Sequence, residues 1–61
     1  MKYRNIIKLY KVQELTTLSR ATIYRLIKIG KFPKKIKLSE RSSGWVEDEV
    51  MEYLDICANN R

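Results

Sequence analysis

One stretch of the sequence, residues 20–29, places small and cationic side chains at a spacing suited to contact with a polyanion. On a helix with 3.6 residues per turn, Ala21, Arg25 and Lys28 share one face. A guanidinium such as that of Arg25 can donate two parallel hydrogen bonds to the O6 and N7 atoms of a guanine, whereas Lys28 suits a phosphate. The small Ala21 would let the helix approach base edges closely. The same pattern also fits the solvated face of an ordinary amphipathic helix, so neighbouring segments must decide between the two interpretations.

Polar residues beside this face are expected to contact the phosphate backbone. Ser19, Arg20 and Thr22 lie at the start of the helix, where phosphate oxygens bind well. Tyr24 borders both the cationic face and the apolar side of the helix. It either contacts DNA or covers the edge of the core, and the sequence supports both interpretations equally.

Two predicted helices joined by a tight turn would position these side chains. Residues 11–18 predict a short helix, and Ser19 is a favourable N-cap for a second helix over residues 20–29. The apolar side of this second helix is formed by Ile23, Leu26 and Ile27. Gly30 can end the helix in a left-handed conformation, and Pro33 prevents it from resuming. A turn of three or four residues between two such helices is typical of a helix-turn-helix.

Residues 34–46 predict a cationic β-hairpin, which we call the wing. Ile36 and Leu38 alternate with lysines, residues 39–44 form a polar turn, and Trp45 begins a short return strand. The cations in and before this hairpin are Lys31, Lys34, Lys35, Lys37 and Arg41. They are expected to neutralise phosphates and release counterions, although lysines on an edge strand also prevent aggregation. Trp45 is expected to pack on the core, with base stacking as the alternative.

Residues 47–58 predict a final helix with an acidic first turn. Its apolar stripe is formed by Val50, Leu54 and Cys57. We therefore expect Cys57 to lie in the core, as most cysteines on apolar stripes do. Tyr3 and Tyr10 are expected to pack around the first helix.

The charge of the chain is unevenly distributed. Residues 1–46 carry twelve lysines and arginines against two carboxylates, a net charge of +10, whereas residues 47–61 carry five carboxylates against Arg61, a net charge of −4. A basic body can bind a polyanion through one face. Contact between the acidic helix of one copy and the wing of the next would also allow head-to-tail assembly.

Composition argues against several classes of function. A chain of 61 residues forms one domain at most, here residues 1–61. With no histidine and a single cysteine, it forms neither an internal disulfide nor a His/Cys metal site. No convincing carboxylate pair or glycine-rich phosphate loop supports catalysis, so we expect no enzyme activity and no cofactor. The unpaired thiol and the short apolar runs suit a cytoplasmic protein that does not contact a membrane.

The sequence resembles the AlpA family of small prophage regulators in several segments. These are LSRATIYRLI at residues 18–27, GKFPK at residues 30–34, GW at residues 44–45, EV at residues 49–50 and YL at residues 53–54. The resemblance covers roughly residues 7–57, although the family more often has Trp at the position of Tyr53. The family is similar to phage excisionases and to the DNA-binding part of MerR-type regulators. The resemblance implies a winged helix-turn-helix whose second helix enters the major groove and whose wing contacts the backbone or the minor groove.

We therefore expect a mainly α-helical winged helix-turn-helix, with three helices and a small β-hairpin. Its expected function is sequence-specific binding of double-stranded DNA by a prophage or mobile-element regulator. It would act as an excisionase-like recombination directionality factor, as a transcriptional regulator, or as both, with an integrase or RNA polymerase as candidate partner. We expect a monomer in solution that assembles head to tail on DNA. The alternative is an interaction module that binds a repressor or integrase without DNA. The two can be distinguished by salt, because DNA binding should weaken steeply as salt increases and a protein contact should not.

Overall fold

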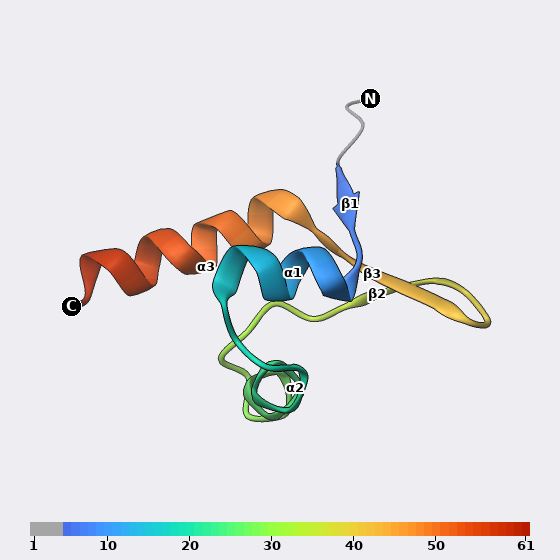
Figure 1. Ribbon diagram of the computed structural model, residues 1–61, viewed down its shortest axis with the longest axis horizontal. Helices are drawn as coiled ribbons and strands as arrows, with labels where there is room; N and C mark the ends of the chain where they lie inside the picture. Colours follow the sequence, from blue (N-terminus) through green and yellow to red (C-terminus); the bar gives the residue numbers. More distant parts are fainter. Residues whose placement is uncertain (1–4) are drawn as a thin grey trace.

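The computed structural model describes residues 5–61 and contains three helices and three short strands (Figure 1). In chain order the elements are β1 (Ile6–Ile7), α1 (Leu9–Thr16), α2 (Arg20–Lys28), β2 (Ile36–Ser39), β3 (Ser42–Val46) and α3 (Glu47–Asn59). The strands form an antiparallel sheet in the order β1-β3-β2. This arrangement confirms the predicted mainly α-helical winged helix-turn-helix.

Helix α1 begins and ends two residues before the predicted range of residues 11–18. It ends because Thr17 adopts the left-handed conformation, with φ of 62°, and donates its N–H to the carbonyl of Gln13 at 2.7 Å. The Thr16 hydroxyl donates to the carbonyl of Val12 at 2.8 Å and accepts the N–H of Leu18 at 3.2 Å. These bonds satisfy backbone groups at the helix end and leave a tight turn of residues 17–19.

Helix α2 follows the sequence-based expectation closely. The Ser19 side chain accepts the N–H of Thr22 at 3.2 Å, which makes it the expected N-cap. The helix ends at Lys28, one residue earlier than predicted, and Gly30 has φ of 77°. A glycine adopts this left-handed conformation without the steric cost of a Cβ atom.

The core is small, and every helix contributes to it. Its fully or nearly fully buried side chains are Val12, Ile23, Phe32, Trp45 and Val50. Trp45 is 1% exposed, and its indole Nε1 donates to the carbonyl of Pro33 at 3.1 Å. The expectation that Trp45 packs on the core is therefore confirmed, and its hydrogen bond ties the segment before β2 to β3.

Strand β1 was not predicted, and it changes the place of the wing in the fold. Ile6 pairs with Val46 and Ile7 with Trp45, so β3 is the central strand of the sheet. A Cβ atom at Gly44 would lie 2.6 Å from Ile6 Cγ2 and 3.0 Å from the carbonyl oxygen of Ile7. Glycine therefore allows β1 and β3 to approach each other closely.

The expected burial of Cys57 is wrong, because its side chain is exposed. Val50 is the buried residue of α3, and the helix continues past the other elements toward the C-terminus (Figure 1). Burial and the neighbouring Cys57 raise the pKa of the Tyr53 hydroxyl above its usual value. Tyr10 is 74% exposed, so the expectation that it packs around α1 is also wrong, and Tyr3 lies outside the described residues.

Candidate nucleic-acid interface

The outer face of α2, formed by Ala21, Arg25 and Lys28, is exposed as its helical spacing predicted. The fully buried Ile23 lies on the other side of the helix. In the view of Figure 1, α2 is seen end-on at the edge of the molecule away from α3. The ion pair found within residues 5–61 joins Lys11 to Glu14, so no described carboxylate neutralises the cations of this face. They are available to bind an anion.

The hydroxyl groups at the start of α2 are engaged with each other. The Ser19 hydroxyl donates to Thr22 Oγ1 at 2.9 Å while its oxygen accepts the Thr22 N–H. Ser19 is exposed and Thr22 is half-buried. The Ser19 side chain thus already binds one of the first N–H groups of the helix, so the protein itself fixes the conformation of the helix start. Contact of these residues with phosphate remains a prediction.

Tyr24 links the helix to the wing. Its ring packs edge-on against Trp45, with centroids 6.4 Å apart and an interplanar angle of 61°. The Arg20 guanidinium carbon lies 5.8 Å from the Tyr24 ring centroid, and Lys35 Nζ lies 5.0 Å from it. Such cation–π contacts are worth about 0.5–1 kcal/mol at exposed sites. Tyr24 therefore covers the edge of the core, which is one of the two roles expected from the sequence. Its ring also contacts two cations from separate segments, Arg20 and Lys35.

The remaining cations of the wing are all exposed, but they occupy different parts of it. Lys34 and Lys35 precede β2, Lys37 lies on the strand, and Arg41 lies in the turn before β3. The hairpin extends away from the helices, so its tip is accessible from several sides (Figure 1). This arrangement presents positive charge at some distance from α2.

Sequence reasoning missed one cation beside the wing, Lys8. Its Nζ donates to Ser42 Oγ, which connects the start of α1 to the first residue of β3. No local pattern marks this contact, because the two residues are 34 positions apart in the sequence. Lys8 therefore extends the cationic surface from the wing toward α1.

Other kinds of site find no support in residues 5–61. This part of the chain contains no cluster of three or more His, Cys, Asp or Glu residues that would hold a metal ion. None of its helices has the length and apolar character needed to cross a membrane.

Comparison with known proteins relates this arrangement to phage proteins. Residues 5–58 match the family described as prophage CP4-57 regulatory protein (AlpA). The chain is also similar to an uncharacterized protein, ORF88, of Enterobacteria phage P4. The two are 39% identical over 44 residues, which is 72% of this chain and 50% of the phage protein. The chain thus spans about half the length of this curated relative.

Proposed function

Because the chain belongs to the AlpA family of prophage regulatory proteins, we propose that it acts by binding double-stranded DNA in a sequence-specific manner. The observation that carries the proposal is the cluster of Arg20, Tyr24 and Lys35. Arg20 from the start of α2 and Lys35 from the segment before β2 lie over the same tyrosine ring, so cations of the helix and of the wing come together at this point. No ion pair within residues 5–61 neutralises Arg20 or Lys35, and such unpaired cations suit a polyanion better than a protein surface.

In this proposal α2 lies in the major groove of the DNA. Ala21 allows close approach, and Arg25 donates two hydrogen bonds to a guanine edge. Lys28 and the residues at the helix start, Ser19, Arg20 and Thr22, contact phosphates and fix the position of the helix. Sequence discrimination therefore depends mainly on Arg25.

The wing supplies affinity that does not depend on sequence. Lys34, Lys35, Lys37 and Arg41 neutralise phosphates of the flanking backbone, and each such contact releases counterions. Tyr24 holds Lys35 near the helix, so it contributes to DNA binding by positioning as much as by contact.

The biological role that we propose is regulation of a prophage or another mobile element in the cytoplasm. The protein would act as an excisionase-like recombination directionality factor, as a transcriptional regulator, or as both, without a catalytic step or cofactor. Its output comes from bending DNA or from recruiting an integrase or RNA polymerase. We infer that it is a monomer in solution and that several copies occupy adjacent sites.

An electrophoretic mobility titration on the DNA flanking its own gene tests this proposal. We expect successive retarded complexes, bending of the DNA, and affinity that falls steeply as salt increases. A single retarded band with a symmetric dimer footprint and no bend would contradict the multi-copy model. Absence of DNA binding, together with salt-insensitive capture of an integrase or repressor, would favour the protein-interaction alternative.

A further inference from the structure

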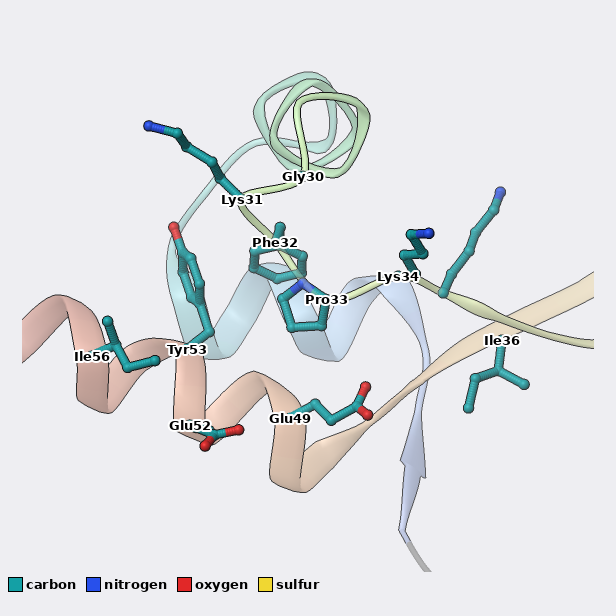
Figure 2. Close-up of a pocket in the computed structure, with 11 residues that line it drawn as sticks. Gly30, Lys31, Phe32, Pro33, Lys34, Ile36, Glu49, Glu52, Tyr53 and Ile56 are labelled. Atoms are coloured by element: carbon teal, nitrogen blue, oxygen red, sulfur yellow. The ribbon is translucent and has the colours of Figure 1, made fainter.

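A groove of about 650 Å³ lies between residues 30–36 and α3, and none of the outer-face residues of α2 lines it (Figure 2). Its floor is apolar. Phe32 is 5% exposed and packs edge-on against Tyr53, with ring centroids 4.7 Å apart, while Ile56 is 54% exposed. Ile56 lies exposed next to Tyr53, so it offers a contact surface for an apolar side chain (Figure 2).

The two walls of the groove carry opposite charges. Glu49 and Glu52 line it from α3, and Lys31 and Lys34 line it from the segment after α2 (Figure 2). Within the described part of the chain no ion pair joins the two walls. A complementary occupant therefore needs an apolar side chain with one positive and one negative group close to it.

The tip of the wing, residues 38–41, has this combination. Leu38 is 47% exposed in β2, where its side chain lies beside Gly44, and the turn after Ser39 places Glu40 and Arg41 next to each other, both exposed. We propose that the wing tip of one copy docks in the groove of a second copy. Leu38 contacts the floor, Arg41 pairs with the acidic wall, and Glu40 pairs with the lysine wall.

The position of the two surfaces makes this contact intermolecular. The hairpin points away from α3, and its tip and the C-terminus lie at opposite ends of the long axis of the molecule (Figure 1). A tip therefore meets the groove of another copy, in a head-to-tail contact that does not close on itself. The long axis measures 36 Å, close to the roughly 34–36 Å of one turn of B-DNA. If the long axis follows the DNA, copies bound one turn apart come within reach of each other.

This inference rests on the proposed DNA-binding function and gives two cations a second partner each. In a docked pair Lys34 of the groove binds Glu40 instead of a phosphate, and the same kind of exchange applies to Arg41. In an isolated copy its guanidinium is free to contact a phosphate. In a row of copies the Arg41 guanidinium binds the acidic wall of the neighbouring molecule instead. Only the last copy in the row, whose wing is not docked, keeps the contact between Arg41 and a phosphate.

The test compares binding to DNA carrying one footprinted site with binding to DNA carrying two sites one helical turn apart. We expect the second wild-type copy to bind about tenfold more tightly than the first. Glu52→Lys in the groove and Leu38→Ser in the wing tip should each remove this gain, while circular dichroism stays unchanged. Asp55→Lys is the matched control, since it makes the same charge change on the exposed surface of α3 outside the groove.

A charge exchange distinguishes docking from a general effect of net charge. The double variant Arg41→Glu with Glu52→Lys has the wild-type net charge. Its second copy should again bind more tightly than its first, with most of the tenfold gain of the wild type. Inserting about half a helical turn between the sites should abolish the gain for every variant. Normal single-site binding with a gain that survives Glu52→Lys and Leu38→Ser would overturn the docking model and leave DNA binding intact.

Sedimentation of the protein without DNA tests docking even if DNA binding itself fails. At low protein concentration the wild type should be the inferred monomer, and at high concentration its average mass should rise continuously, as an open-ended contact requires. Glu52→Lys should remain monomeric under the same conditions. Equal sedimentation of the wild type and this variant would contradict the proposal.

Discussion

The two strands of the wing are adjacent, yet they differ fully in burial. In β3, Gly44, Trp45 and Val46 are buried, whereas all four residues of β2 are exposed. β3 lies between two strands and packs on the core, while β2 is an edge strand. Ile36 and Leu38 of β2 are 40% and 47% exposed. Alternating apolar residues therefore identify a strand, but whether another element covers that strand depends on the whole fold.

Helix α2 shows the same division between residues that hold the fold and residues that remain available to a ligand. Ile23 is completely buried, and Arg25, two positions later, is exposed. Substitutions on the buried side should change stability, and substitutions on the exposed side should change binding. The following predictions test this separation.

Replacement of Trp45 by alanine should have the largest effect. The ring is almost fully buried and anchors β3 to the segment before β2. Loss of a buried tryptophan costs about 3–5 kcal/mol, and a domain of this size has little more in total. We expect the variant to be largely unfolded by circular dichroism. A folded Trp45→Ala protein that fails only in DNA binding would place Trp45 among the DNA contacts instead.

The Gly44→Ala substitution tests the close approach of β1 and β3. The added methyl group would overlap Ile6 and the backbone of Ile7, so the strands must separate. Such overpacking costs about 1–3 kcal/mol, measured as the free energy of unfolding in urea. Ser43→Ala, at the neighbouring half-buried position, is the control and should change stability by less than about 0.5 kcal/mol.

At Arg25 the expected effect is on binding and not on stability. Arg25→Ala should weaken specific binding by about 1–3 kcal/mol, because one bidentate base contact is lost. Arg25→Lys keeps the charge but not the paired donors, so it should retain non-specific affinity and lose discrimination between sites. Competition titrations with specific and unrelated DNA measure both quantities. Wild-type discrimination in either variant would exclude Arg25 as the residue that recognises the sequence.

The smallest effect is expected at Lys37 on β2. Lys37→Ala should weaken binding to all sequences alike and should lower the slope of log affinity against log salt by about one unit. Its unfolding free energy should stay close to that of the wild type, because the side chain is exposed. Lys11→Ala is the control, since Lys11 pairs with Glu14 on α1, and its salt slope should not change. A loss confined to the specific site would contradict a phosphate contact for Lys37.

Features with a local signal were predictable from the sequence. Ser19 caps α2, Gly30 follows its end, and the helical spacing placed Ala21, Arg25 and Lys28 on the exposed face. These features depend on residues within one or two helical turns, where propensity and periodicity act directly.

Features that depend on distant residues were not predictable. Strand β1 has two residues, too few to show a period, and it exists because β3 pairs with it. Cys57 follows the correct helical stripe, but α3 extends beyond the elements that could cover it. The environment of Tyr24 likewise required knowledge of where Trp45 and Lys35 lie.

The pairing of β1 with β3 has a consequence for synthesis of the chain on the ribosome. Ile6 contacts Val46, and the N–H of Glu47 donates to the carbonyl of Asn5 at 2.9 Å. Closing so long a loop costs chain entropy that only the completed core repays. Helices α1 and α2 therefore leave the ribosome before the strand that joins them to a core exists. The domain can therefore complete its fold only after residues 42–46 have left the ribosome and can pair with residues 6–7.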